Sequence, residues 1–389
     1  MLDFYYHTPT EIFFGKGKEK QVGEIIKNYG YRKIMIQYGK GSVKKSGLYD
    51  VVVSSLKQNG IEFVEMGGVE PNPKLSFVRQ AIKVAKEQGV EFILAVGGGS
   101  VLDSCKYTAL GTVTDIDVWD FAMGKATPKS ALEVGCILTM SAAGSEMSNS
   151  AVITNTELNM KKGCTTEFNR CKFAIMNPEL TYTVGKYQTA CGVVDIMAHT
   201  MERYFSVCPP TPLTDGIAET ILKNVIKAGS VLMKDPTDYD ARAIVMWASS
   251  LSHNGLTGCG RENYLAVHQL EHALSGEYDQ VAHGAGLAVL FPAWAKYVYK
   301  HNVDRFYQFA INVFGVSGTD KEKVALEGIK KMAEYFKSLE MPLSLSDFGL
   351  QKDCTARLSE LCTFFKSRTI KSYIPLGYQE IKDIFDSSF

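Results

Sequence analysis

The chain has 389 residues, a length that predicts two domains. Of these residues 46% are hydrophobic and 22% charged, a composition typical of a folded globular protein. Its 42 Lys and Arg residues balance 42 Asp and Glu residues, which excludes a global field that would recruit nucleic acid or an acidic membrane surface. The charge balance leads us to expect no nucleic-acid partner. No apolar stretch is long enough to span a bilayer, so we also expect no membrane association.

The first half of the chain alternates short apolar runs with helical patterns. Strands are predicted over residues 32–38, 61–66, 92–96, 135–139 and 172–176. Helices are predicted over residues 48–59 and 75–88 and directly after the glycines at 97–99. This alternation predicts a parallel, doubly wound, Rossmann-like α/β sheet.

The pattern changes after the Asn177-Pro178 break. From about Thr189 onward the apolar residues recur with helical spacing, as in residues 214–234, 240–256 and 321–339. We therefore expect an α/β domain over residues 1–180, followed by an all-helical domain over residues 181–389.

Two glycine-rich turns follow predicted strands. Gly97, Gly98, Gly99 and Ser100 end one strand and open a helix, where a phosphate can approach the backbone and the positive end of the helix dipole. Asp103, one turn further, is a candidate acceptor for a ribose or nicotinamide amide. The GxGxxG spacing is absent, and a flexible turn explains the glycines nearly as well, but ligands bind where parallel strands end.

The second turn is Gly39-Lys40-Gly41-Ser42. An NAD-selective site usually places a carboxylate at the end of such a strand, whereas lysines and a hydroxyl tolerate the 2′-phosphate of NADPH. The turn therefore favours NADPH over NADH, although a solvated lysine-rich loop would explain it almost as well.

Histidines are concentrated in one segment of the second half. His268, His272 and His283 are three of the seven histidines in the chain, and His268 and His272 share one helix face. Asp195 and His199 repeat the same four-residue spacing upstream. Two such pairs on separate helices can surround one divalent ion, so the pattern predicts a metal site rather than isolated core histidines.

An alternative stays open because residues 268–272 match H-x-x-E-H, the inverted zinc-protease motif. In a zinc hydrolase both histidines would bind zinc and Glu271 would activate water. That alternative gives neither the 97–100 turn nor the Asp195/His199 pair a role. A non-catalytic metal-binding or sensor protein would use the ligands but needs no dinucleotide domain.

Several motifs together resemble the iron-containing (group III) alcohol dehydrogenase family, in particular its butanol dehydrogenase branch. They are GGGSVLDSCK at 97–106, AAGSE at 142–146, Asp195-x-x-x-His199 and the His268/His272/His283 cluster, with FFGKG, VEPNP and MWASSLSHNGL elsewhere. The resemblance implies a dehydroquinate synthase-like architecture with metal and substrate between the two domains. Ala143 departs from the family pattern, which has a hydroxyl there.

Residue roles follow from the resemblance position by position. The implied metal ligands are Asp195, His199, His268 and His283. His272 matches a histidine near the nicotinamide that relays a proton. The implied cofactor-binding residues are Gly39, Gly41, Ser42, Asn72, Gly97, Gly98, Gly99, Ser100, Asp103, Thr139, Ser141 and Lys161.

The expected reaction is reversible reduction of a short, butanol-like aldehyde to its primary alcohol by NAD(P)H, with the metal polarising the carbonyl oxygen. Fe2+ is the favoured metal and Zn2+ the main alternative. Glycerol dehydrogenase-like and dehydroquinate synthase-like enzymes share the two-domain plan, so a polyol substrate stays open. The nine cysteines form no CxxC pair, which predicts reduced thiols and a cytoplasmic location. The resemblance also implies a homodimer.

Overall fold

The structure, a computed structural model, describes all 389 residues and comprises two compact units. The α/β unit is His7–Val184, and the helical unit consists of Met1–Tyr6 together with Gly185–Phe389. The first six residues thus belong with the helices, where the backbone N–H of Leu2 donates to the carbonyl of Gly260 (2.9 Å). None of the helices is long and apolar enough to cross a membrane.

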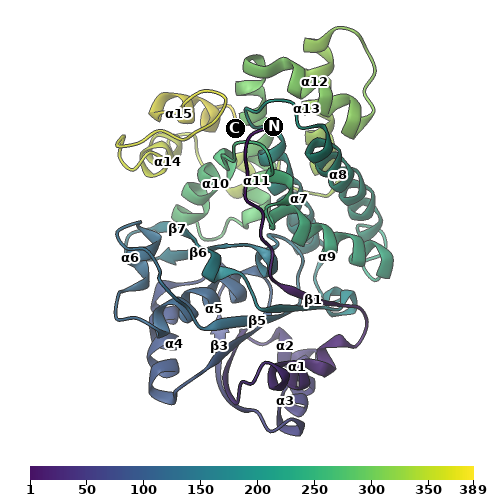
Figure 1. Ribbon diagram of the computed structural model, residues 1–389. Coiled ribbons are helices and arrows are strands. Elements are labelled where there is room, and N and C mark those ends of the chain that lie inside the picture. The colour runs from purple at the N-terminus through teal and green to yellow at the C-terminus, as the bar shows by residue number, and fades with distance from the viewer. The chain divides into compact units, whose positions relative to one another are not determined.

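The α/β unit is built on a sheet flanked by helices (Figure 1). This sheet has six strands in the order β1-β8-β5-β4-β2-β3. All its strand pairs are parallel. The strands are β1 (Glu11–Phe14), β2 (Lys33–Gly39), β3 (Glu62–Val69), β4 (Phe92–Gly97), β5 (Glu133–Leu138) and β8 (Phe173–Met176). Every residue of β4 is buried, as expected of a central parallel strand covered on both faces.

Helices cover both faces of this sheet. Ile34 and Ile36 of β2 pack with α1 and α3, whereas Gln37, which points to the opposite face, bonds Ser104 and Thr108 of α5 (both 3.0 Å). The helices of this unit are α1 (Val22–Asn28), α2 (Ser42–Lys45), α3 (Leu48–Gln58), α4 (Leu75–Gln88), α5 (Gly99–Thr112) and α6 (Val118–Ala122). The short 3₁₀ turns are η1 (Lys18–Gln21), η2 (Ser145–Met147), η3 (Glu167–Asn169) and η4 (Pro178–Thr181). The predicted doubly wound α/β class is confirmed.

Five of the six strands correspond to predicted ones; β1 and a separate antiparallel hairpin do not. The hairpin consists of β6 (Ser150–Asn155) and β7 (Met160–Thr165). It is tied to the rest of the unit through Thr154, whose N–H donates to the carbonyl of Pro73 (2.8 Å).

The strand order reverses between β2 and β4. The chain passes from β2 to β3 on one side and then returns to β4 on the other, with Tyr38 paired to Val96. Gly39 and Gly97, the last residues of these two strands, therefore lie at the switch point. Open α/β sheets bind ligands at this position, just beyond the carboxyl ends of the strands.

The helical unit has one large hydrophobic core. Its helices are α7 (Lys186–Tyr204), α8 (Pro212–Leu232), α9 (Tyr239–His253), α10 (Ala266–Glu277), α11 (His283–Val298), α12 (Val303–Phe314), α13 (Lys321–Ser338), α14 (Cys354–Cys362) and α15 (Tyr378–Asp386). Its 3₁₀ turns are η5 (Leu256–Gly258), η6 (Tyr299–Asn302) and η7 (Leu345–Phe348). Every residue of α7 from Thr189 to Tyr204 is buried, so each polar side chain of that stretch needs a partner inside the protein.

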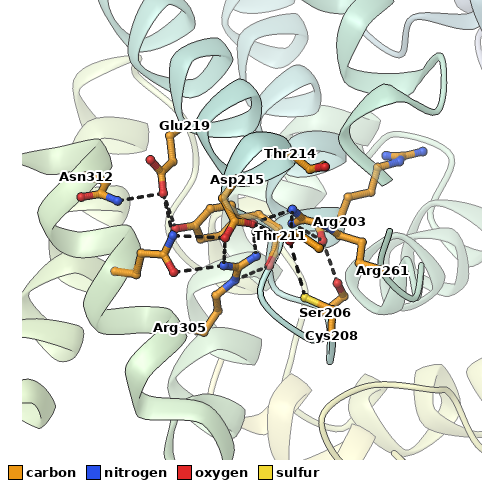
Figure 2. A network of polar contacts seen from close by, with 12 residues as sticks. Arg203, Ser206, Cys208, Thr211, Thr214, Asp215, Glu219, Arg261, Arg305 and Asn312 are labelled. Carbon is orange, nitrogen blue, oxygen red and sulfur yellow. Dashed lines mark hydrogen bonds and ion pairs between the residues drawn. The ribbon is translucent and has the colours of Figure 1, made fainter. Parts of the chain in front are cut away.

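A buried ionic network joins several of these helices (Figure 2). Asp215 of α8 accepts from Arg261 (2.5 Å) and from both terminal nitrogens of Arg305 on α12 (2.7 and 2.6 Å). Arg261 also donates to the backbone carbonyl of Arg203 near the end of α7 (3.2 Å). The network therefore fixes the carboxyl end of α7 relative to α8 and α12.

Candidate metal and cofactor sites

Four side chains from three helices of the helical unit converge on one point. Asp195 Oδ1 lies 3.5 Å from His199 Nε2, 3.5 Å from His268 Nε2 and 3.7 Å from His283 Nε2. Asp195 and His199 come from α7, His268 from α10 and His283 from the first residue of α11. The structure thus brings together the four residues that the resemblance implies as ligands.

These separations fit a bound cation. Four ligand atoms at about 2.1 Å from a tetrahedral ion are about 3.4 Å apart, close to the three distances around Asp195. Asp195 Oδ1 and His268 Nε2 are also buried without a hydrogen-bond partner, although such atoms are rarely left unsatisfied. A divalent ion coordinated at this point would satisfy both atoms.

The other nitrogen of each imidazole is engaged as well. His268 Nδ1 contacts the carboxylate of Glu202, and His283 Nδ1 contacts that of Glu271. His199 Nδ1 lies 2.9 Å from His253 Nδ1. Partners at Nδ1 hold the ring orientation and direct Nε2 toward a metal, which is the usual arrangement around metal-binding histidines.

Charge also favours a divalent cation. Asp195, Glu202 and Glu271 are buried acids, and Arg203 is the buried base that contacts this cluster. With neutral imidazoles these four groups carry a net charge of about −2, which is costly inside a protein unless it is compensated. One divalent ion balances it.

The histidine pKa values differ with their neighbours. Burial, together with the positive groups around it, holds the pKa of His199 well below its usual range. Burial also acts to lower the pKa of His268, but Glu202 and Asp195 outweigh it and raise the pKa to about 9. His199 is therefore ready to act as a ligand at neutral pH, whereas His268 must first give up a proton.

Local packing explains how these helices place their ligands. Glu202 accepts from the backbone N–H groups of Val267 and His268 and so caps the start of α10, where no side chain of the preceding segment does so. A Cβ at Gly284 would lie 2.2 Å from the carbonyl oxygen of Cys191, so the start of α11 can approach α7 only with glycine there. This approach brings His283 to Asp195.

His272 lies beside the cluster. Its ring centroid is 5.6 Å from that of His283 and 6.4 Å from that of His268. His272 is half-buried, and the side chain of His283 is 24% exposed compared with 5–6% for the other three converging residues. The cluster is therefore most accessible on the side of His283 and His272.

The geometry does not support the zinc-hydrolase alternative. Glu271 is fully buried and its carboxylate contacts His283 Nδ1. A general base of a hydrolase must instead reach a water bound at the metal.

In the α/β unit, the turn at residues 97–100 opens α5 at the switch point. A Cβ at Gly97 would lie 2.5 Å from Val101, so packing demands glycine there. A Cβ at Gly99 would meet nothing closer than Ala143 at 3.9 Å, and neither Gly98 nor Gly99 has a positive φ. The protein itself thus does not require glycine at residue 99, whereas a phosphate approaching the start of the helix would.

Asp103 connects this helix to the segments beside it. It accepts from Ser145 Oγ (2.7 Å) and from the N–H of Val152 on β6 (2.9 Å). Buried Lys106, one turn further, donates to Ser145 and to the carbonyls of Ser148 and Ser150 (2.6–3.1 Å). The 145–152 segment is therefore fixed against α5.

The remaining predicted cofactor residues lie on segments connected to this region. Asn72 has a φ of 51°, a left-handed conformation that asparagine tolerates well. Lys161 pairs across the hairpin with Thr154, which bonds Pro73 in the same loop as Asn72. Thr139 follows β5 and donates its N–H to the carbonyl of Gly97 (3.0 Å), and Ser141 is two residues further along.

The turn at residues 39–42 has acidic neighbours that its own segment does not predict. Lys40 pairs with Glu70 (2.7 Å), and Lys44 with Glu65 of β3 (3.5 Å). Tyr38 also donates to Glu65 (2.6 Å). The turn therefore has both lysines and glutamates as neighbours of Gly39, Gly41 and Ser42, although no carboxylate lies within the turn itself.

Sequence reasoning missed Glu202 and His253 as partners at Nδ1, and it named the third partner, Glu271, only as the base of the alternative hydrolase. Glu202 and Arg203 follow His199 by three and four residues, and His253 ends α9. Helical spacing from His199 could have drawn attention to the first two, but only the fold brings His253 to the same point.

The α/β unit has a parallel sheet with glycine turns at its switch point, as in nucleotide-binding α/β proteins. The helical unit carries a buried Asp/His cluster of the kind that binds a metal ion. The chain belongs to the iron-containing alcohol dehydrogenase family. The family model described as "Iron-containing alcohol dehydrogenase" matches residues 9–178, and "Fe-containing alcohol dehydrogenase family, C-terminal" matches residues 189–389.

Curated and structural relatives span the whole chain. The chain is 42% identical to NADH-dependent butanol dehydrogenase A of Clostridium acetobutylicum, with 100% of both chains covered. It is 38% identical to the NADPH-dependent aldehyde reductase YqhD of Escherichia coli, with 90% of both covered. A crystal structure of NADH-dependent butanol dehydrogenase A from Thermotoga maritima has a TM-score of 0.97 and 40% identity, covering 100% of this chain and 99% of that one.

Proposed function

We propose that this protein is a metal-dependent alcohol dehydrogenase that interconverts short primary alcohols and aldehydes by hydride transfer. As a family member it is an NAD(P)-dependent oxidoreductase of the alcohol dehydrogenase and aldehyde reductase class. Relatives named butanol dehydrogenase, similar over the full chain, support a short, butanol-like substrate. The observation that carries the metal part is the convergence of Asp195 with His199, His268 and His283.

Those four residues would hold the ion, and Glu202, Glu271 and His253 would orient the three imidazoles. The bound metal supplies Lewis-acid polarisation of the carbonyl oxygen. One carboxylate and three imidazoles suit Fe2+ and Zn2+ alike. The family description favours iron, and we propose Fe2+ with Zn2+ as the alternative.

Cofactor binding is assigned to the switch-point edge of the sheet. The N–H groups at the start of α5, beside Gly98, Gly99 and Ser100, would hold the pyrophosphate. Gly39, Gly41 and Ser42 would lie along the adenosine ribose. The other cofactor contacts are assigned to Asn72, Gly97, Asp103, Thr139, Ser141 and Lys161.

Protein groups then orient the reactants and move the proton. In the reductive direction a bound nicotinamide cofactor would supply hydride for the carbonyl carbon, and a ring nitrogen of His272 would give a proton to the oxygen that becomes the hydroxyl. Imidazole suits this step because it titrates near neutral pH. The half-buried position of His272, next to the exposed side of the cluster, is compatible with contact to substrate.

The preferred cofactor is proposed to be NADPH. Lys40 and Lys44 support it because they can neutralise a 2′-phosphate. Their pairing with Glu70 and Glu65 weakens this support, and the relatives include both NADH- and NADPH-dependent enzymes. The ratio of kcat/KM for NADPH to that for NADH measures the preference, and a ratio below one overturns it.

The proposed activity is tested by following nicotinamide absorbance with butanal and either reduced cofactor, before and after chelation. We expect cofactor oxidation that stops on chelation and returns with ferrous iron under reductant. Recovery with zinc alone, in air, would replace iron with zinc. Activity on glycerol and propanediol but on no short aldehyde would instead favour a polyol dehydrogenase.

We also propose an oligomeric state and a cellular location. A homodimer follows from the family resemblance and is tested by light scattering after size exclusion. A cytoplasmic location is proposed from the nine scattered cysteines, which lack a CxxC pair, and cell fractionation tests it.

A further inference from the structure

We infer that His253, held by Arg203, is a positioning residue that sets which nitrogen of His199 carries the proton and thereby keeps His199 Nε2 available to the metal. The inference rests on the proposed metal site. It concerns His199 alone, because His268 and His283 have carboxylates at the corresponding position. His253 lies at the end of α9, far from His199 in the sequence and beside it in the fold.

The direction of the hydrogen bonds follows from Arg203. Its guanidinium lies 3.0 Å from His253 Nδ1 and can only donate, so His253 Nδ1 must be the unprotonated, accepting nitrogen. The proton of the neutral His253 ring is then on Nε2. Because His253 Nδ1 also lies 2.9 Å from His199 Nδ1, His199 Nδ1 must be the donor of that pair.

This assignment leaves the lone pair of His199 on Nε2, the atom that lies 3.5 Å from Asp195 Oδ1. Glu202 and Glu271 enforce the same state on His268 and His283, since carboxylates accept from Nδ1. Once His268 has given up its extra proton to bind the metal, all three imidazoles present an unprotonated Nε2 beside Asp195. His253 thus accepts the Nδ1 proton of His199, as Glu202 and Glu271 do for His268 and His283.

Arg203 explains why an acceptor is needed here. Its other terminal nitrogen donates to the backbone carbonyl of His199 (2.7 Å), so the guanidinium is held between the His199 backbone and the His253 ring. Its own backbone carbonyl accepts from Arg261 of the buried network, so its position is anchored (Figure 2). Without His253, His199 Nδ1 would lose this acceptor, and the tautomer that places a proton on Nε2 would no longer be disfavoured.

A neutral partner at this point also limits the charge. Asp195, Glu202, Glu271 and Arg203 together carry a net charge of about −2. A carboxylate in place of His253 would raise this to about −3, whereas the neutral His253 ring adds no charge. One divalent ion then balances the cluster. The mixed set of two carboxylates and one imidazole is consistent with that balance.

The test compares metal affinity of His253→Leu, His253→Gln and wild-type enzyme, each stripped and titrated with Zn2+ against a competing chelator. His301→Leu, at an exposed histidine on η6, controls for loss of a histidine. We expect His253→Leu to bind zinc about 10- to 100-fold more weakly. His253→Gln, whose amide oxygen accepts from both neighbours, should keep most of the affinity, and His301→Leu all of it.

Melting of each metal-free variant separates loss of the ligand geometry from loss of the fold. Zinc affinity of His253→Leu equal to wild type overturns the inference, and so does a loss that His253→Gln shares in full. A wild-type protein that binds no divalent metal overturns both this inference and the proposed metal site. If the wild-type protein reduces no aldehyde but His253→Leu still binds zinc more weakly, the inference is supported and only the proposed dehydrogenase activity is overturned.

A second measurement reads the tautomer directly. In the zinc-loaded protein with ¹⁵N-labelled histidine, we expect His253 to be protonated at Nε2 and His199 at Nδ1. A proton on His253 Nδ1 contradicts the inference, whatever the affinities are.

Discussion

Of the five histidines around the cluster, His272 lies beside the converging nitrogens, next to His283, whose side chain is the most exposed of the four proposed ligands. Its ring centroid is 5.6 Å from that of His283, and the residue is half-buried. His272→Ala should therefore lower kcat by about 10²- to 10⁴-fold through loss of the proton donor, with metal content near one ion per chain. Steady-state kinetics with elemental analysis of the same sample measures both.

The metal content makes this prediction specific. If His272→Ala loses its metal in parallel with its activity, His272 belongs among the ligands. His283, whose side chain is the most exposed of the four proposed ligands, would then be the residue to reassign.

The pKa of His268 predicts how metal affinity depends on pH. Neighbouring acids outweigh burial and raise the pKa of His268 to about 9, so the metal-free protein carries a proton on this residue at neutral pH. Metal must displace that proton, and affinity should rise about tenfold per pH unit up to about pH 9 and level off above it. His199 adds no such dependence near neutral pH because its pKa is lowered.

Chelator competition at a series of pH values measures this slope. Affinity that stays constant between about pH 6 and 8 would show that His268 is already neutral before the metal binds.

Predictability at the residue scale depended on spacing. The pairs Asp195/His199 and His268/His272 are visible in the sequence because one helix face repeats every three to four residues. The same five letters, H-x-x-E-H, could not show whether Glu271 faces water or a histidine; its burial and its contact with His283 decide that. Glu202 contacts His268 and His253 contacts His199, each from a different helix, and no local sequence pattern indicates such contacts.

At the scale of elements, the approach of α11 to α7 positions His283. Because a Cβ at Gly284 would lie 2.2 Å from the carbonyl oxygen of Cys191, Gly284→Ala must push these helices apart. We expect a loss of about 1–3 kcal/mol in the free energy of unfolding and weaker metal binding. Urea unfolding and chelator competition measure the two effects.

Gly216→Ala is the matched control. Gly216 lies in α8, and a Cβ added there would meet nothing within 4 Å, so alanine should stabilise that helix slightly and leave metal binding unchanged. Equal effects of the two substitutions would exclude helix approach as the cause.

The start of α5 allows a similar separation of folding from ligand binding. Gly99→Ala has room within the protein, so stability should hold or rise slightly, while KM for the cofactor rises about tenfold because the methyl group occupies the path of the phosphate. Gly97→Ala, whose Cβ would lie 2.5 Å from Val101, should instead reduce stability. An unchanged KM in Gly99→Ala would place the pyrophosphate elsewhere.

The elements that were predicted are those with strong periodicity or continuous apolar runs. Strand β4 is buried throughout and is bounded by Gly97, so its sequence stands out. Strand β1 has only four residues and its ends are exposed, and the β6–β7 hairpin is short and carries polar residues. Strand β1 forms because β8 offers it a free edge, and β6 and β7 pair with each other; a local pattern registers neither pairing.

At the scale of the whole molecule, the order of elements predicted the architecture. Alternating strands and helices imply a parallel sheet, and the later helical periodicity implies a bundle, because each element must bury an apolar face. Residues Met1–Tyr6 belong to the helical unit although they precede β1 in the sequence. That association depends on the bond between Leu2 and Gly260 and on packing by Tyr6 near Gly255, which only the folded chain brings together.

The stability of the helical unit should depend on the buried ionic network around Asp215. Asp215→Asn would leave the guanidiniums of Arg261 and Arg305 buried without their carboxylate, at a cost of about 3–5 kcal/mol. Although burial opposes it, the two arginines lower the pKa of Asp215 to about 2. This part of the stability is present above about pH 4 and is lost as the pH falls through about 2, because the unfolded chain binds the proton more readily.

Urea unfolding of wild type and Asp215→Asn at pH 7 and at about pH 2.5 tests both statements. The asparagine variant cannot lose a carboxylate charge at this position, so the gap between the two proteins should narrow by roughly 2 kcal/mol at the lower pH. A gap that stays constant would mean that the network acts through packing and hydrogen bonds alone. A gap that narrows would show that the charge of Asp215 helps to hold α8 and α12 against the end of α7, which carries the proposed ligands Asp195 and His199.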